Sequence, residues 1–270
     1  MITAKNVRVA IAGVEGRMGS MLTKFIVQNK KVFLGAALVK KGSNIIGIDV
    51  GELLGVNPLN IMITDDLINV LNDFDILIDF TNPKNTKYLL LVCKKYKKSM
   101  IIGTTGFNEI EKKNIQETSK AIPIVLSENF SIGINVMYKL LAITAKLIGD
   151  YNTRIVETHH KKKVDIPSGT ALQIKEIICN NIEVNSKSFC INEKIIFSND
   201  KRKNNINIVS IRSENIIGEH KVIFSTINER LEINHKALNR TIFAYGVVKA
   251  CLWLKEKKVG LYSMQDVLNI

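Results

Sequence analysis

The stretch VRVAIAGVEGRMG at residues 7–19 combines an apolar run with three closely spaced glycines. Val7–Ala12 has the composition of a buried strand, and the helical spacing of apolar residues begins at Gly19. Gly13 and Gly16 permit a tight turn whose backbone N–H groups can approach a pyrophosphate at the positive end of the helix dipole. A strand, a glycine turn and a helix in this order predict a dinucleotide-binding βαβ unit.

Outward from this stretch, short apolar runs alternate with amphipathic segments up to about residue 129, a pattern typical of a parallel sheet. Beyond it, a helical segment is followed mainly by strand-like runs, which predicts a separate mixed sheet. The expected fold class is therefore α/β, with a Rossmann-type parallel-sheet nucleotide domain and a second α+β domain. The expected strands are 7–12, 32–39, 75–80, 100–102, 122–126, 153–158, 206–212, 221–225 and 230–235. The expected helices are 19–29, 83–97, 108–120, 134–148, 171–178 and 241–255.

The composition excludes several classes of protein. The chain has 270 residues and a formal net charge of +13, but its lysines are scattered in pairs and only seven of the 38 basic residues are Arg. A coding sequence rich in A and T explains this bias, so we expect no nucleic-acid partner. No apolar stretch is long enough for a transmembrane helix and no signal peptide is recognisable, so we expect no membrane partner. Four cysteines without a CxxC pair favour a reduced, cytoplasmic enzyme.

The end of the second expected strand bears on cofactor choice. An acid at this place would hold the ribose hydroxyls of NAD, but the sequence has Val39 followed by Lys40 and Lys41. Two ammonium groups, with Arg17 in the glycine turn, favour the additional phosphate of NADPH, with NADH still possible. The alternative is that both lysines are ordinary solvated surface residues.

Three further strand ends carry small or polar residues where an open α/β sheet binds its ligand. They are Phe80-Thr81, Gly103–Gly106 and Ser127–Phe130. Their glycines permit close backbone approach, and their hydroxyl and amide groups can bind a carboxamide. A plain turn remains the alternative interpretation of Gly103–Gly106.

The segment from Glu157 to Ala171 holds the strongest chemical signal. Adjacent His159 and His160 at a strand end point to opposite sides and are poorly placed to chelate one ion, so we expect no metal site. An imidazole is a suitable proton donor near neutral pH, and Lys163 can stabilise negative charge or donate a proton. Ser168-Gly169-Thr170 opens a helix and can bind a carboxylate. The alternative is a solvated basic loop before a capped helix.

The run E-x-H-H-x-x-K-x-D-x-P-S-G-T-A at residues 157–171 resembles the signature of the dihydrodipicolinate reductase family of lysine and diaminopimelate biosynthesis. The resemblance continues in order along nearly the whole chain. It includes Gly13–Gly19, Asp79-Phe80-Thr81, Ile102–Gly106, Asn129-Phe130-Ser131, Gly218-Glu219-His220 and Gly260-Leu261-Tyr262.

This resemblance implies a homotetrameric, two-domain oxidoreductase that reduces a small cyclic dicarboxylate with NADH or NADPH. Its C-terminal helix would return to the nucleotide domain, giving a dinucleotide-binding domain at 1–130 with 241–270 and a substrate-binding and oligomerisation domain at 131–240. His159 would be the general acid and Lys163 its catalytic partner. The implied substrate-binding residues are His160, Ser168, Gly169 and Thr170. The expected cofactor-binding residues are Gly13, Val14, Glu15, Gly16, Arg17, Met18, Lys40, Phe80, Gly103, Thr104, Thr105, Ser127, Glu128, Asn129 and Phe130.

The chain departs from the family pattern in four places. Val39 replaces the acid of members that use NADH well, and Glu128 replaces a small residue. The segment 199–205 is polar and basic, and Glu214-Asn215 replaces the family's Gly-Asp. Two rival functions remain at this point. One is a non-catalytic dinucleotide-binding sensor, which would not need the His-His-x-x-Lys cluster. The other is a different nicotinamide-dependent dehydrogenase, acting on aspartate or homoserine.

Overall fold

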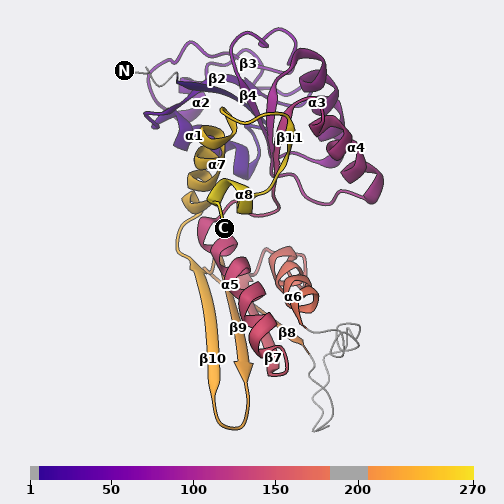
Figure 1. Ribbon diagram of the computed structural model, residues 1–270. Coiled ribbons are helices and arrows are strands. Elements are labelled where there is room, and N and C mark those ends of the chain that lie inside the picture. The colour runs from indigo at the N-terminus through magenta and orange to yellow at the C-terminus, as the bar shows by residue number, and fades with distance from the viewer. Residues whose placement is uncertain (1–5, 183–205) are drawn as a thin grey trace. The chain divides into compact units, whose positions relative to one another are not determined.

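The computed structural model describes residues 6–182 and 206–270 and divides into two compact units (Figure 1). The first comprises Met1–Phe130 with Thr241–Asn269, and the second comprises Ser131–Arg240 with Ile270. Each unit has its own sheet and its own hydrophobic core.

The first unit is built on a seven-stranded sheet of order β11-β6-β5-β4-β1-β2-β3, in which every neighbouring pair is parallel. The chain order reverses at β1, which lies between β2 and β4. In an open parallel sheet, this reversal opens a crevice at the carboxyl ends of the strands. The strands are β1 (Val7–Ala12), β2 (Val32–Leu38), β3 (Ile63–Thr64), β4 (Ile76–Asp79), β5 (Ser99–Ile102), β6 (Pro123–Leu126) and β11 (Gly260–Tyr262).

Helices cover both faces of this sheet, as the run of buried residues in β1 requires. Val9 and Ile11 pack in one core cluster, which also contains residues of α1 and α7, whereas Ala10 and Ala12 pack in another with residues of α3 and α4. The helices are α1 (Arg17–Val27), α2 (Val50–Leu54), α3 (Pro83–Tyr96), α4 (Glu109–Ser119), α7 (Thr241–Leu254) and α8 (Met264–Leu268).

The second unit contains a four-stranded sheet of order β10-β9-β7-β8, with β7 and β8 parallel and the other neighbours antiparallel. Helices α5 (Ile132–Ile148) and α6 (Gly169–Asn181) share a core cluster with residues of one face of this sheet, called here the inner face. The strands are β7 (Asn152–His160), β8 (Asn207–Ser213), β9 (Gly218–Ser225) and β10 (Arg230–Ala237). The predicted fold class, a Rossmann-type sheet plus a second domain with a mixed sheet, is confirmed.

The observed elements differ from expectation mainly at their ends. Helix α1 begins at Arg17 instead of Gly19, because Gly16 already has the extended conformation of an N-cap. The short elements α2, β3, β11 and α8 were not expected, because two to five residues are too few to show a period. The basic segment 199–205 lies outside the described residues.

The cysteines require a correction. Cys93 and Cys251 are free and buried, but Cys179 is disulfide-bonded, so the expectation of fully reduced cysteines was wrong. In the part of the chain that the structure describes, no helix is long and apolar enough to cross a membrane.

Candidate active site

The glycine turn after β1 forms a close-packed cradle at the first unit's strand ends. Gly13 has a φ of +81°, and its N–H donates to Leu38 O at 2.8 Å. A Cβ on Gly19 would lie 2.0 Å from Gly13 O, so only glycine fits where the helix meets the turn. No side-chain oxygen caps α1, because Gly16 is its N-cap. The first N–H groups of α1 can therefore bind an anion, and the cradle fits the pyrophosphate of a dinucleotide.

Beside this cradle, the segment after β2 holds both predicted lysines. Val39 is buried, whereas Lys40 and Lys41 are exposed. The hydroxyl of Ser43 donates to Glu15 Oε1 at 2.5 Å, which ties the glycine turn to this segment. The exposed ammonium groups are available to a phosphate, and Val39 offers no carboxylate to ribose hydroxyls.

Asp79, at the end of β4, organises the neighbouring strand ends. Its buried carboxylate accepts hydrogen bonds from the Thr81 hydroxyl at 2.6 Å and the Thr86 hydroxyl at 2.5 Å. Burial raises the pKa of Asp79, against the effect of these hydrogen bonds. The Thr81 N–H also donates to Thr104 Oγ at 3.0 Å, which joins the ends of β4 and β5.

The other residues predicted to bind the cofactor, which follow β4, β5 and β6, also lie in the first unit. The Phe80 ring packs so closely on Gly103 that a Cβ there would lie 2.1 Å from it, and it meets the Phe130 ring at 5.5 Å between centroids. The Ser127 hydroxyl donates to Asn129 O at 2.9 Å. Thr104 is buried, whereas Thr105 and Glu128 are exposed.

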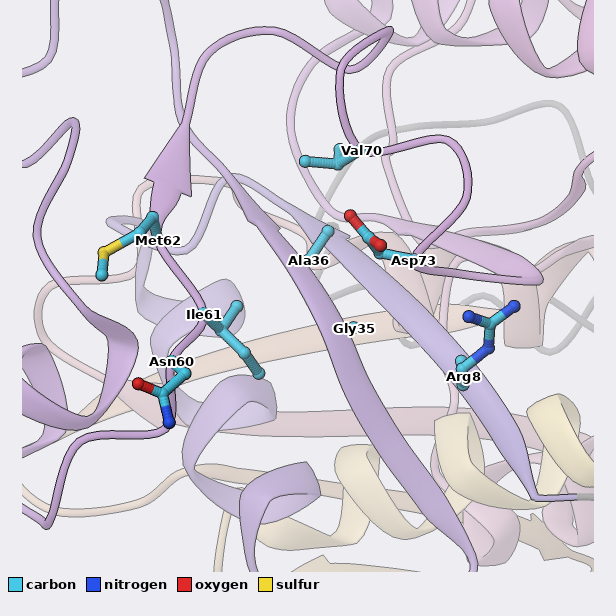
Figure 2. Close-up of a pocket in the computed structure, with 8 residues that line it drawn as sticks. All are labelled: Arg8, Gly35, Ala36, Asn60, Ile61, Met62, Val70 and Asp73. Carbon is cyan, nitrogen blue, oxygen red and sulfur yellow. The ribbon is translucent and has the colours of Figure 1, made fainter.

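A pocket of about 430 Å³ lies elsewhere in the first unit and contains none of the predicted residues (Figure 2). Gly35 and Ala36 of β2 form part of its lining, with Arg8 and Asp73 at one end and Asn60 and Met62 at the other. Arg8 is the second residue of β1, so the pocket reaches the amino half of that strand, whereas ligands of open α/β sheets bind at carboxyl ends. We do not assign this pocket to the cofactor.

In the second unit, strand register gathers ionisable residues on the inner face. Glu157 of β7 lies opposite His220 of β9, which lies opposite His235 of β10. His159 follows Glu157 by two residues, so both side chains point to the same face, and it lies opposite Arg212 of β8. Four strands thus contribute to one group of polar residues.

Glu157 is the charged centre of this group. Its side chain is fully buried; one oxygen is hydrogen-bonded to His159 Nδ1, and the other accepts from Arg212 Nη1 at 3.0 Å. Burial raises the pKa of Glu157, but hydrogen bonds from His159, Ser210 and Arg212 outweigh that effect and lower the pKa to about 2. The carboxylate is therefore ionised throughout the physiological range.

His220 lies against His159, with 5.1 Å between ring centroids, and its Nε2 is 3.3 Å from the hydroxyl of Ser168. Burial and the nearby His159 lower the pKa of His220 to about 3, so this ring is neutral at physiological pH. Ser168 is also the N-cap of α6 and accepts from the Ala171 N–H at 3.2 Å. The helix N-terminus thus lies beside the imidazole pair.

The loop between β7 and α6 holds the second predicted catalytic residue. Lys163 Nζ lies 2.8 Å from Asp165 Oδ2. Burial raises the pKa of Asp165, but the hydrogen bond and charge of Lys163 outweigh it and lower that pKa. Arg212 Nη2 donates to Asp165 O at 2.8 Å, so one guanidinium joins this loop to Glu157.

The predicted substrate-binding residues lie at two places in this unit. Gly169 and Thr170 open α6 directly after Ser168. His160 is the last residue of β7, and strand alternation directs it to the side opposite His159.

Glu157, His159 and His220 offer ligand atoms within 4.8 Å of one another, a grouping that no sequence spacing revealed. A divalent ion would have to compete with His159 and Arg212 for the oxygens of Glu157. The cation at Arg212 opposes a second positive charge there. The arrangement therefore fits an ion-paired imidazole better than a metal centre.

Sequence reasoning assigned no role to Glu157, Arg212 or Asp79. Glu157 belongs to the quoted signature, and its spacing of two residues from His159 in a strand was the available signal. Arg212 carried no such signal, because it is 55 residues from its partner Glu157.

Sequence-family models match the chain over nearly its full length. The model described as "Dihydrodipicolinate reductase, N-terminus" covers residues 7–130, and "Dihydrodipicolinate reductase, C-terminus" covers residues 133–268.

Several solved structures share the fold. A dipicolinate-bound dihydrodipicolinate reductase from Paenisporosarcina sp. TG-14 has 23% identity and a TM-score of 0.76, covering 97% of this chain and 98% of its own. An amine dehydrogenase from Mycobacterium smegmatis has 10% identity and a TM-score of 0.66, with coverage of 96% and 95%. An oxidoreductase from Agrobacterium radiobacter, in complex with NAD+, L-tartaric acid and magnesium, has 12% identity and a TM-score of 0.55, with coverage of 98% and 93%.

The fold and these matches define an NAD(P)-dependent oxidoreductase. The chain belongs to the dihydrodipicolinate reductase family, whose members are reductases of lysine biosynthesis.

The depressed pKa of His220 predicts a pH-dependent stability. Between its unfolded pKa near 6.5 and its folded pKa of about 3, the unfolded chain binds a proton that the folded chain does not. The free energy of unfolding should therefore fall with decreasing pH across this window, by up to about 1.4 kcal/mol per pH unit from this residue. Urea titrations of the wild type and His220→Gln should show a shallower slope in the variant. Equal slopes would contradict the prediction.

Proposed function

We propose that this protein reduces 4-hydroxy-tetrahydrodipicolinate to tetrahydrodipicolinate with NAD(P)H, as a cytoplasmic enzyme of lysine and diaminopimelate biosynthesis. The observation that carries the proposal is the buried imidazole of His159, hydrogen-bonded to an ionised carboxylate in a chain of this family. A dinucleotide sensor would have no use for such a group.

His159 acts as the general acid in this proposal. When bound, NAD(P)H supplies a hydride to the substrate ring. His159 gives one proton, and the 4-hydroxyl leaves as water. The added hydride replaces the lost hydroxide, and the added proton converts that hydroxide to water, so the reaction balances. The ammonium group of Lys163 stabilises the negative charge that develops on the substrate.

The substrate is a small cyclic dicarboxylate, and we assign its carboxylates to Ser168, Gly169 and Thr170 with His160. The N-terminus of α6 supports this assignment, because its N–H groups and dipole favour an anion. The dipicolinate bound to the Paenisporosarcina enzyme belongs to the same chemical class.

The cofactor belongs to the first unit in this proposal, held by the glycine turn and the ends of β2, β4, β5 and β6. Lys40 favours NADPH over NADH. Val39 has no carboxylate to bind the ribose hydroxyls of NADH. The segment 131–240 then serves substrate binding and oligomerisation.

His159→Ala should lower kcat by about 10²- to 10⁴-fold, the usual contribution of a general acid. The assay follows NADPH absorbance while a matching synthase makes the substrate from pyruvate and aspartate semialdehyde. Lys161→Ala is the control, because Lys161 is an exposed neighbour paired with Glu214. An unchanged rate in His159→Ala would remove the assignment.

The same assay separates the rival functions. Tight NADPH binding without oxidation would favour the sensor. Oxidation or reduction that depends on aspartate or homoserine, and not on the synthase, would favour another dehydrogenase.

Replacing both Lys40 and Lys41 with Ala should raise the Kd for NADPH by at least about tenfold and leave the Kd for NADH nearly unchanged. Fluorescence titration with each cofactor measures both constants. The matched control replaces Lys30 and Lys31, an exposed lysine pair before β2. Equal weakening of both cofactors would show that Lys40 and Lys41 do not bind the additional phosphate.

We also propose a homotetramer formed through the outer face of the second unit's sheet, the face opposite α5 and α6. Val209 and Ile211 of β8 are 41% and 44% exposed on this face. Val209→Lys should therefore produce smaller assemblies in light scattering, since a buried unpaired charge opposes association. Ile110→Lys on α4 is the control, because Ile110 is 80% exposed in the first unit. A wild-type monomer would contradict the proposal.

A further inference from the structure

The buried carboxylate of Glu157 is bound by donors from two strands. His159 lies on the same strand, and Ser210 and Arg212 lie on β8, directly opposite Glu157 and His159 in the parallel register. Neither oxygen of Glu157 is left for a substrate, so this carboxylate can act only through its partners.

We propose that Glu157, held by Arg212, is a positioning residue that keeps the proton of His159 on Nδ1 and directs Nε2 to the substrate. This inference rests on the proposed role of His159 as the general acid.

The surroundings of the His159 ring leave Nε2 as the ring nitrogen available to the substrate. Across residues 6–182 and 206–270, no side chain or backbone group makes a hydrogen bond to this atom, whereas Nδ1 is bound to Glu157. Gly218 lies beside Nε2, and a Cβ at that position would approach it to 3.1 Å. The missing side chain at Gly218 therefore keeps space open beside Nε2.

The charges around the His159 ring explain why a carboxylate is required beside it. Arg212 lies opposite His159 on β8, and the neutral ring of His220 on β9 packs against it. Lys163 in the following loop adds a positive charge that acts on His220. His235 on β10 lies beyond His220. A protonated imidazole among these groups is repelled unless a negative charge adjoins it, and Glu157 supplies that charge.

The proton transfer balances within this arrangement. Nε2–H gives its proton to the substrate, Nδ1–H stays bonded to Glu157, and His159 becomes neutral. A proton from water restores the imidazolium after product release. Glu157 remains ionised throughout, in the manner of the buried acid of hydrolase triads.

Arg212 extends the same support to the loop. Its Nη1 holds Glu157 while its Nη2 holds the carbonyl of Asp165, whose carboxylate pairs with Lys163. A single guanidinium thus aligns both groups proposed to act on the substrate.

The first test measures the tautomer of His159 directly and does not depend on enzymatic activity. The chain has four histidines, so ¹⁵N-histidine NMR of the whole protein is tractable, with His159→Gln assigning the signal. We expect His159 Nδ1 to remain protonated across the pH titration, with a downfield proton that is lost in Glu157→Gln. A neutral His159 carrying its proton on Nε2, with a bare Nδ1, would overturn the proposal even if Glu157→Gln does not fold.

The second test is kinetic. Glu157→Gln should lower kcat by about 10- to 100-fold, less than removal of the acid itself, with KM changed by less than about threefold. Glu176→Gln is the control, since Glu176 is exposed on α6.

The outcomes separate this inference from the proposed function. If the wild type reduces the substrate and His159→Ala does not, the function stands, and an unchanged kcat in Glu157→Gln overturns the positioning role. If the wild type shows no reduction, the function fails, and the NMR signal alone decides whether Glu157 fixes the tautomer.

Discussion

The second unit depends on one physical constraint, the burial of the negative charge of Glu157 within a sheet. A carboxylate without exposed surface is stable only when donors surround it. Arg212 and Ser210 can supply these donors only if β7 and β8 pair in one register, because a shift by one residue would turn both side chains to the outer face. The same register aligns His159 and, through Arg212, the loop that carries Lys163.

In the first unit, the glycine turn at the strand ends leaves hydrogen-bond donors free, whereas the donors around Glu157 are used within the protein. Its glycine turn brings backbone together so closely that a side chain on Gly19 would collide with Gly13, and no side chain caps α1. Donors are thus left for an anion instead of being satisfied internally. Asp79 provides the rigidity, because its bonded threonines join adjacent strand ends and hold the neighbouring turns in place.

Local patterns could be predicted, and contacts between distant segments could not. The strand, glycine turn and helix from Val7 onward depend on neighbouring residues, so sequence sufficed for them. The N-cap role of Ser168 was equally local. Glu157 and its partner Arg212 are 55 residues apart, and no periodic pattern in the sequence indicates that they pair. The disulfide at Cys179 was missed for a related reason, since composition indicates a redox environment only on average.

By itself, the sequence determined the α/β fold class and membership of the dihydrodipicolinate reductase family, since glycine spacing and the 157–171 signature are readable in order along the chain. Only the tertiary structure decided which groups surround His159. Glu157, His220 and His235 come from three strands, and they meet because backbone hydrogen bonds set the register between those strands. Register is a property of paired strands, so no single segment of sequence contains it.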